Sequence, residues 1–263
     1  MMDRRSLLDR AAKSADERVL LGHILDKYDQ CRQRNLPTNT AFLTPAEARS
    51  ALDLLHAAAV HEGFALLGGY EGAERRMLFF LPDWQEEADT AEAMAFLRAR
   101  WHESEQPTHR DLLGSLMALG VERETLGDIL VSEGSSDLVV SAGVAQYLLD
   151  NWSGAGRTAL RLTAIGADEL SIPAQRVKEI HDTVATLRLD AVTAAGFSMS
   201  RSKAAELIAA GRVQKNHRET TKGDASVAQG DIISARGLGK FEVAEVGGLS
   251  KKGRTGILLR RYL

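Results

Sequence analysis

The sequence predicts an α+β protein in three parts, and three observations lead to this fold class. Amphipathic helical patterns dominate the first part of the chain, strand-like and helix-like segments alternate in the middle, and a helix pair followed by strand patterns closes the sequence. We therefore expect a mainly helical N-terminal domain over residues 1–72. A central α+β domain is expected over 73–172 and a third domain, with a strand leading into it, over 173–263.

Charge is distributed unevenly along the chain. The 263 residues are enough for two or three small domains, and their net charge is −3. From Thr186 to Leu263, however, 14 Lys and Arg face 7 Asp and Glu, a net of +7, so the remainder, with 19 against 29, carries −10. A basic C-terminal part on an acidic body favours contact of that part with nucleic acid, because cation–phosphate contacts dominate such affinity.

Composition also excludes several classes of protein. Cys31 is the single cysteine, so an intrachain disulfide and a cysteine-cluster metal site are excluded. His56 and His61 are five residues apart and would not share a helix face as metal ligands do. The N-terminus lacks an apolar core of signal-peptide length, and no apolar run approaches 18 residues. We expect a cytoplasmic protein with no membrane segment, metal or cofactor.

Helix signals are clear in the N-terminal part. Apolar residues recur at helical spacing from Ser14 to Arg34. Thr44-Pro45-Ala46-Glu47 has the form of a capping box with proline at the first helical position, which predicts a second helix. We expect Gly63 to end that helix.

The central part alternates strands and helices. GFALLGG and RRMLFFLP read as a strand pair in which Phe79 and Phe80 point to opposite faces. A helix is expected to open at Thr108, with Leu112, Leu113, Leu116, Met117 and Leu119 inward and Gly120 at its end. The strands GDILVS, DLVVSA and ALRLTAIG, with a helix around Val144 to Leu149, suggest a small sandwich like an RNA-recognition fold. These three strands lack Phe, Tyr and Trp, so base stacking on this sheet is not expected.

A linker and a basic helix follow. Ser171-Ile172-Pro173-Ala174 is the expected linker, and Val177 to Ile180 begin a strand. Ser200 is the expected N-cap of a helix that turns Ala204, Leu207 and Ile208 inward and ends at a left-handed Gly211. Arg201 and Lys203 lie in its first turn, where cations oppose the helix dipole. A bound phosphate would reverse that penalty, which indicates a phosphate contact there.

The end of the chain completes a recognisable pattern. A short strand is expected from Val213 to Asn216, and Gly230-Asp231 turns into the strand DIISARG. The ordered pattern RLD, SRSxAxxLIxxGxVxxN and GDxIxxRG resembles the RNA-binding domain named after the fourth small-subunit ribosomal protein, the S-four domain or αL motif. The resemblance implies RNA binding. The candidate RNA-binding residues are Ser200, Arg201, Lys203, Arg212, Lys215, Asn216, Arg236, Gly237 and Lys240.

A wider resemblance covers nearly the whole chain and is weakest before Leu43. GGYEGAERRMLFFLP, HRDLLGSLMALGVERETLGDILV and SARGLGKF occur in the order seen in the YlmH family of bacterial proteins. The resemblance implies a helical N-terminal domain, a central RNA-recognition-like domain and a final S-four domain. It also implies binding of structured rRNA and tRNA on large ribosomal subunits left holding peptidyl-tRNA after stalled translation. We expect a monomer.

One loop departs from the family pattern. Relatives commonly show Arg-Gly-Arg-Gly-Arg-Phe where this chain has Arg236-Gly237-Leu238-Gly239-Lys240-Phe241. One cation is lost and another is lysine, which cannot make the bidentate phosphate contact of arginine. We therefore expect this loop to bind phosphates less specifically than it does in relatives.

Two other readings stay open. Pseudouridine synthases often carry an S-four domain and use an aspartate in an Arg-Leu-Asp context, which Arg188-Leu189-Asp190 matches, although here the domain comes last and a structural role for Asp190 is favoured. We therefore expect a protein without catalytic residues. In the central domain, a protein-docking surface at Glu122, Arg123, Glu124 and Asp128 competes with a second RNA contact through Arg75, Arg76, His109 and Arg110.

Overall fold

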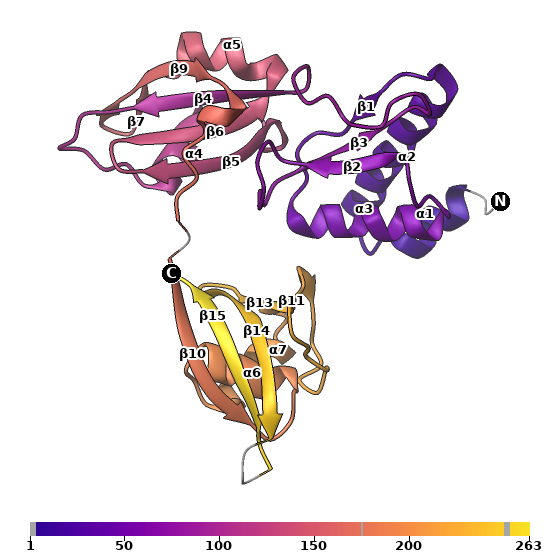
Figure 1. The fold of residues 1–263 in the computed structure, drawn as a ribbon, viewed down its shortest axis with the longest axis vertical. Helices are drawn as coiled ribbons and strands as arrows, with labels where there is room; N and C mark the ends of the chain where they lie inside the picture. Colours follow the sequence, from indigo (N-terminus) through magenta and orange to yellow (C-terminus); the bar gives the residue numbers. More distant parts are fainter. Residues whose placement is uncertain (1–3, 175, 250–252) are drawn as a thin grey trace. The chain divides into compact units, whose positions relative to one another are not determined.

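The computed structural model describes residues 4–174, 176–249 and 253–263, and it has the mixed α+β character that the sequence predicts. Residues 1–173 and 174–263 each form a compact unit (Figure 1). Each unit has its own hydrophobic cores, so each is described by itself.

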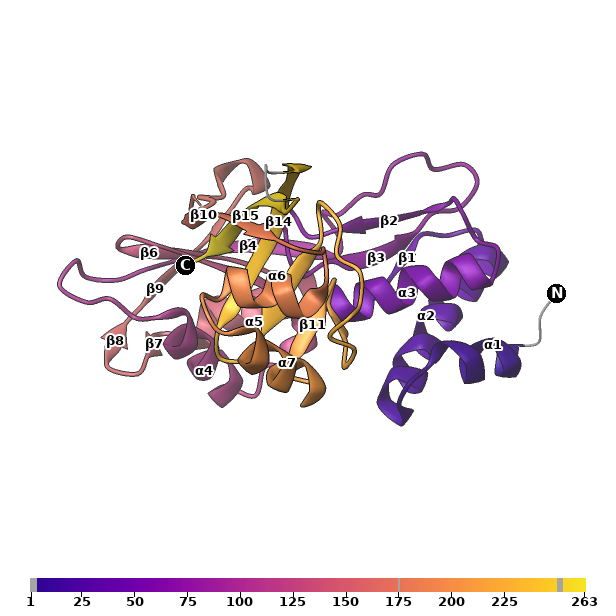
Figure 2. The same ribbon diagram turned by 90° about the horizontal axis from the view of Figure 1, so that it is seen from below.

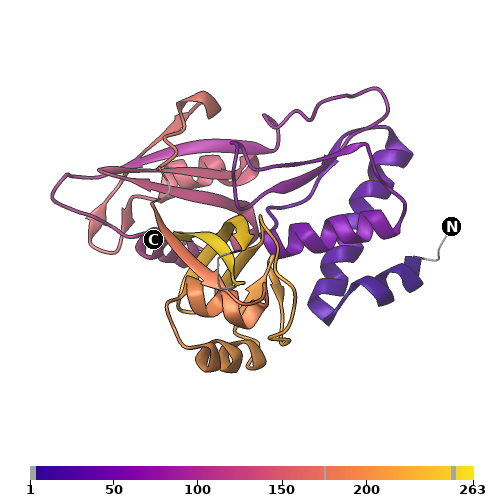
Figure 3. The same cartoon turned by 60° about the horizontal axis from the view of Figure 1, so that its bottom comes forward.

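Three helices and a small antiparallel sheet begin the first unit. The sheet has the strand order β1-β3-β2, and the indigo and violet helices gather beside it (Figure 3). Their buried apolar side chains form one core with those of β3. The elements are α1 (Arg4–Ala11), α2 (Ala15–Arg34), β1 (Thr38–Asn39), α3 (Pro45–Ala57), β2 (Phe64–Leu67) and β3 (Met77–Phe80).

The helix starts are confirmed, and one helix end is not. Ser14 Oγ accepts a hydrogen bond from Glu17 N at 3.1 Å at the start of α2, and Thr44 forms the predicted capping box with Glu47. The expectation that Gly63 ends α3 is wrong. The helix closes earlier, where Ala59 takes a left-handed φ of 57°. Ala59 N donates to His56 O and Val60 N donates to Leu55 O, and these two hydrogen bonds form a Schellman motif. An alanine replaces the usual glycine there, so composition alone misplaces the end.

Phe79 and Phe80 face opposite sides of β3, as predicted. Phe80 packs into the helical core, whereas Phe79 packs into a second cluster with Phe42 and Met94. Both rings are almost fully buried, so neither serves as a stacking platform.

The first sheet extends beyond the division expected at residue 72. β3 pairs with β2 from Phe64↔Phe80 to Leu67↔Met77, and also with β1. β3 was expected to open the central domain, but it is hydrogen-bonded to strands of the N-terminal sheet. The first sheet therefore ends at Phe80, and the second begins after it.

The second sheet has a βαββαβ order with helices on one face (Figure 2). Its strand order is β5-β6-β4-β9, all antiparallel, so β4 and β6, the first and third strands of the βαββαβ segment, lie at its centre. The elements are β4 (Met94–Arg100), α4 (His109–Ala118), the 3₁₀ turn η1 (Arg123–Thr125), β5 (Leu126–Ser132), β6 (Ser135–Ser141), α5 (Ala142–Asn151), β9 (Arg161–Ile165) and η2 (Ala167–Glu169). A small hairpin of two strands with two residues each, β7 (Gly154–Ala155) and β8 (Thr158–Ala159), precedes β9.

Helix α4 begins and ends as predicted but exposes one residue expected inside. Thr108 and Asp111 form its capping box, and Gly120 follows with a φ of 80°. Leu112 and Leu116 are buried, whereas Met117 is 43% exposed. The helix buries a narrower stripe than the run of apolar letters suggests.

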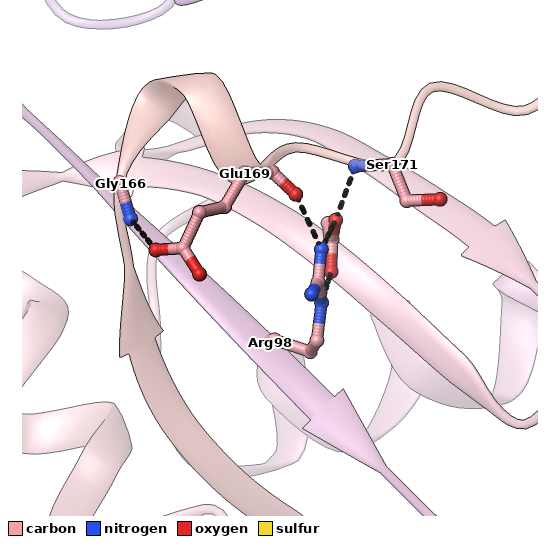
Figure 4. Close-up of polar contacts among 5 residues, drawn as sticks. Arg98, Gly166, Glu169 and Ser171 are labelled. Atoms are coloured by element: carbon pink, nitrogen blue, oxygen red, sulfur yellow. Dashed lines mark hydrogen bonds and ion pairs between the residues drawn. The ribbon is translucent and has the colours of Figure 1, made fainter.

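The other face of this sheet is partly covered by the chain itself. Phe96 of β4 packs against the loop at Gly69, where an added Cβ would lie 2.6 Å from the ring. Further along, Arg98 holds the buried Asp137 through two hydrogen bonds of 2.6 and 2.7 Å. Arg98 also donates to Glu169 O, and Ser171 N donates to Asp137, so the start of the linker is fixed on the sheet (Figure 4).

The second unit is a six-stranded antiparallel sheet with two helices on one face (Figure 2). The predicted lead-in strand is β10, which pairs with the last strand along its whole length. Phe241 lies at the centre of the core against Gly196, where a Cβ would be 2.3 Å from the ring. The order is β10-β15-β14-β13-β11-β12, with β10 (Val177–Val184), α6 (Leu189–Gly196), α7 (Arg201–Ala209), β11 (Val213–Lys215), β12 (Arg218–Glu219), β13 (Ile232–Ala235), β14 (Gly239–Leu249) and β15 (Thr255–Tyr262).

Candidate nucleic-acid interface

Helix α7 starts and ends where the sequence predicts. Ser200 Oγ accepts a hydrogen bond from Lys203 N at 3.2 Å, and Gly211 follows the helix with a φ of 66°. Ala204, Leu207 and Ile208 are buried. The two cations of the first turn therefore stay on the solvent side, with 54% of the Arg201 side chain and 60% of the Lys203 side chain exposed.

Asp190 joins the starts of α6 and α7. Its carboxylate is buried and accepts hydrogen bonds from Arg188 at 3.0 and 3.3 Å and from Arg201 at 3.0 and 3.1 Å. Burial alone would raise the pKa of Asp190, but the hydrogen bonds and charges of the two guanidinium groups outweigh it and lower that pKa. The carboxylate therefore stays ionised and fixes both arginines.

Arg188 is a cation that the sequence reasoning did not include among the binding residues. Its side chain is 41% exposed and shares Asp190 with Arg201. The Arg-Leu-Asp triplet contains this arginine next to the helix start, but the sequence pattern indicates a role for its aspartate only.

Lys215 and Asn216 lie around a second buried carboxylate, that of Asp231. Lys215 Nζ is 3.0 Å from Asp231 Oδ2 and donates to Ser226 O at 2.6 Å. The Asn216 amide donates to Asp231 at 2.7 Å and accepts from Ile232 N at 2.9 Å. Asn216 also adopts a φ of 51°, so it forms a turn and does not continue the strand as expected. Its side chain is used to hold the fold.

One loop gathers the cations of these two clusters. Leu189 N and Asp190 N donate to the carbonyls of Ala225 and Gly223, and Arg188 forms a backbone bridge with Ser226. Because Lys215 binds Ser226 O as well, the structure brings Arg188, Arg201 and Lys215 around residues 223–227. We call these three residues, with Lys203, the helix-start patch. The carboxylates of Asp190 and Asp231 are buried, whereas Glu206, 3.1 Å from Lys203, and Asp224 of the loop are exposed beside these donors.

The remaining predicted residues lie elsewhere in the unit. Arg236 N donates to Arg212 O at 3.0 Å, and both side chains are exposed beside Gly237, whose φ is 81°. Lys240 lies on the opposite face of the sheet, because its neighbour Phe241 points to the helices. Its ammonium group is 5.0 Å from the centre of the Tyr262 ring.

The second predicted RNA contact lies in the first unit, and one of its cations, Arg75, is buried. Arg75 is 8% exposed, and its guanidinium donates to the carbonyls of Leu126, Phe42 and Arg123. It is buried where the two sheets of the unit meet and is not a surface cation, which corrects the expectation. The sequence does not distinguish an arginine that donates to backbone carbonyls inside the fold from an arginine that binds a phosphate at the surface.

The other members of that set are more accessible. Arg76 is half-buried, and His109 and Arg110 are exposed at the start of α4. Desolvation and the nearby Arg123 lower the pKa of His109, so it adds little charge at neutral pH. Asp111 already caps this helix start by accepting from Thr108 N at 2.9 Å, which weakens it as a phosphate site.

Two features are absent from residues 4–174, 176–249 and 253–263. No helix in these ranges is long and apolar enough to cross a membrane. The same ranges hold no group of three or more His, Cys, Asp or Glu residues placed to bind a metal ion.

Comparisons with known proteins agree with this picture. The family model described as "Putative RNA-binding domain in YlmH" matches residues 103–169. The "Ribosome-associated protein quality control protein P2" of Bacillus subtilis (strain 168) is 34% identical over 248 residues, which cover 94% of this chain and 95% of that protein. The chain belongs to the YlmH family. The solved structure of the cell division protein ylmH from Streptococcus pneumoniae has 20% identity and a TM-score of 0.50, covering 62% of this chain and 98% of that one, and it supports the fold alone.

Membership of the YlmH family confirms the resemblance drawn from the sequence motifs. The matched model spans α4 to η2 and therefore most of the βαββαβ sheet domain. The nine candidate RNA-binding residues at the end of the chain lie in the second unit, outside the matched range, whereas His109 and Arg110 of the second predicted contact lie inside it.

Proposed function

We propose that this YlmH-family chain is a non-catalytic RNA-binding protein of the ribosome, which holds structured rRNA or tRNA on large subunits obstructed by peptidyl-tRNA. The name of the Bacillus subtilis relative supports the ribosomal setting, and the description of the family model supports RNA binding. We assign the second unit as an S-four domain and the βαββαβ part as RNA-recognition-like.

The observation that carries the proposal is the pair of arginines fixed on Asp190. Arg188 and Arg201 share one buried carboxylate, each with a large part of its side chain exposed. Each guanidinium has more donors than the carboxylate uses. A phosphate at the start of α7 would meet these donors, Lys203 and the positive end of the helix dipole together.

The charge division supports contact through the second unit. Residues 174–263 carry 16 Lys and Arg against 9 Asp and Glu, a net of +7, whereas residues 1–173 carry 17 against 27, a net of −10. Phosphates are attracted to the first of these surfaces and repelled by the second. Because the cations are fixed on a folded surface and stacking aromatics are few, a structured RNA suits the surface better than an extended single strand.

Pseudouridine synthesis is the alternative, and the surroundings of Asp190 do not favour it. A catalytic aspartate needs a free oxygen and room for a base, whereas both oxygens of Asp190 accept from arginines. Gly223 also lies against it, with an added Cβ 3.4 Å from Asp190 Cβ. Formation of pseudouridine in tRNA or rRNA fragments incubated with the protein, and its loss in Asp190→Asn, would establish the enzyme instead.

RNA affinity measured against salt tests the proposal. Lys203→Glu and Arg236→Glu should each weaken binding of a folded tRNA about tenfold and reduce the slope of log K against log salt by roughly 0.7–0.9. Arg260→Glu is the matched control, since it changes the charge equally on the outer face of the same sheet. Equal effects of all three variants, or a wild-type affinity independent of salt, would contradict the proposal.

A further inference from the structure

The first unit holds a cleft that the RNA interface does not use. It has a volume of about 590 Å³ and lies between the end of α2, the loop after α3 and the segment after β3. Its floor is apolar and buried, formed by Cys31, Val60, Phe80 and Leu81. This volume lies within the usual range for sites that enclose a side chain or small ligand.

The rim of the cleft is acidic. Glu62, Asp83 and Glu86 are exposed on it, and Arg32 is its single arginine or lysine, paired with Asp83. With histidine neutral, the rim carries a net charge of −2. This rim repels phosphates and attracts a cation.

One lining residue has an unused acceptor. Gln85 Nε2 donates to Glu87 O at 2.8 Å, but Gln85 Oε1 is buried without a hydrogen-bond partner. A buried acceptor left without a donor is energetically costly. Because this oxygen has no accessible surface, a ligand in the cleft meets it only if the Gln85 side chain turns outward.

Trp84 does not itself line the cleft, but in sequence it lies between the lining residues Asp83 and Gln85. Its side chain is 61% exposed, although Nε1 donates to Asn35 O at 3.0 Å and so holds the indole in place. Leu36, 56% exposed, adjoins Asn35 in sequence. A fixed, exposed indole beside carboxylates is a suitable surface for a cationic side chain, because tryptophan gives the strongest cation–π contacts.

We propose that this cleft binds an arginine side chain from an extended basic segment of a partner protein, with Trp84 as the stacking surface. The guanidinium would pair with Glu62 or Glu86, which are exposed on the rim. Arginine fits better than lysine, because its planar fork matches a carboxylate and stacks on an indole. RNA is disfavoured by the charge of the rim.

Peptide binding to the full-length protein tests this proposal. The probe is a short fluorescein-labelled peptide of alternating arginine and glycine, and its partner is the same peptide with citrulline, which has the shape of arginine without the charge. The citrulline peptide should bind at least about tenfold more weakly in fluorescence anisotropy. Equal binding of the two peptides would overturn the proposal.

Variants locate the site. Trp84→Ala and Glu62→Gln/Glu86→Gln should each weaken the arginine peptide roughly fivefold or more, and Trp84→Phe should keep most of the affinity. Glu103→Gln/Glu133→Gln removes the same charge from exposed positions away from the cleft and should leave binding unchanged. If this control weakens binding as much, or if spermidine competes as well as the peptide does, the attraction is general to cations and the proposal fails. RNA affinity should be unchanged in all these variants, so the result is independent of the proposed function.

Discussion

At the scale of single residues, buried carboxylates fix the positions of cationic side chains in the second unit. Asp190 and Asp231 are both buried, and the hydrogen bonds they accept outweigh burial and lower the pKa of each. Arg201 and Lys215 are therefore not loose surface cations but fixed ones. A fixed guanidinium loses less side-chain entropy when it meets a phosphate, which favours binding.

Replacement of Asp190 should loosen the starts of α6 and α7. A carboxyl whose pKa is lowered on folding contributes stability above its unfolded pKa of about 3.9, and this contribution is lost as the pH falls through the lower folded pKa. Asp190→Asn should therefore cost about 1–2 kcal/mol at pH 7 and progressively less below pH 4. Hydrogen exchange of the α6 and α7 amides measures the difference. An equal cost at pH 7 and at about pH 3 would show that the charge of Asp190 is not what holds the arginines.

The cap of α7 gives a second residue-scale prediction. Ser200→Ala removes the acceptor of Lys203 N and should destabilise the helix by about 1 kcal/mol, whereas Ser200→Asp should keep the cap. Thermal unfolding followed by amide exchange in α7 checks both. RNA affinity should fall for Ser200→Asp despite its intact helix, because an added carboxylate would repel the phosphate. Unchanged RNA affinity in Ser200→Asp would place the phosphate elsewhere.

At the scale of elements, capped helices and alternating strands were the most predictable features. Ser14, Thr44, Thr108 and Ser200 each mark a helix start, because a side-chain cap is a local interaction written in adjacent residues. The end of α3 at Ala57 was not predictable, since the left-handed alanine that follows it, Ala59, is tolerated only through contacts that the sequence does not show. The same holds for Arg75 and Asn216, whose partners lie far along the chain.

The hairpin between β13 and β14 carries the chain's departure from the family pattern. Leu238 stands in its loop with 36% of its surface exposed, and its carbonyl accepts from Arg261 at 3.3 Å. The hydrogen bond uses the backbone, so the side chain can change without breaking it. The loop therefore tests how many cations the interface uses.

Leu238→Arg should strengthen RNA binding. It places a cation beside Arg236 and should make the negative slope of log K against log salt steeper by roughly 0.7–0.9, the value of one added phosphate contact. Leu249→Arg adds the same charge at an exposed position of β14 and serves as the control. A gain in the control as large as in Leu238→Arg would mean that only the net charge of the unit matters.

At the scale of the whole molecule, opposite charges on the two units give each a different kind of partner. The unit of net +7 suits RNA, and the unit of net −10 suits basic protein surfaces. The linker between them is short, because Ser171 is still held to Asp137 and β10 begins at Val177. Two contacts made by units tethered so closely reinforce each other, since binding of one raises the local concentration of the other.

This tethering predicts the behaviour of the protein on ribosomes. In sucrose gradients of cells under translation stress, the wild-type chain should sediment with large subunits, and Lys203→Glu/Arg236→Glu should move it to the top of the gradient. If the basic partner segment belongs to the large subunit, Trp84→Ala should leave the protein on large subunits at low salt but release it at a lower salt concentration than wild type, because only the RNA contact remains and that contact weakens with salt. Arg176→Glu/Arg260→Glu, at two exposed arginines of the same unit, controls for the change in net charge. Sedimentation of Lys203→Glu/Arg236→Glu that matches wild type at every salt concentration would mean that the RNA interface does not hold the protein on the ribosome.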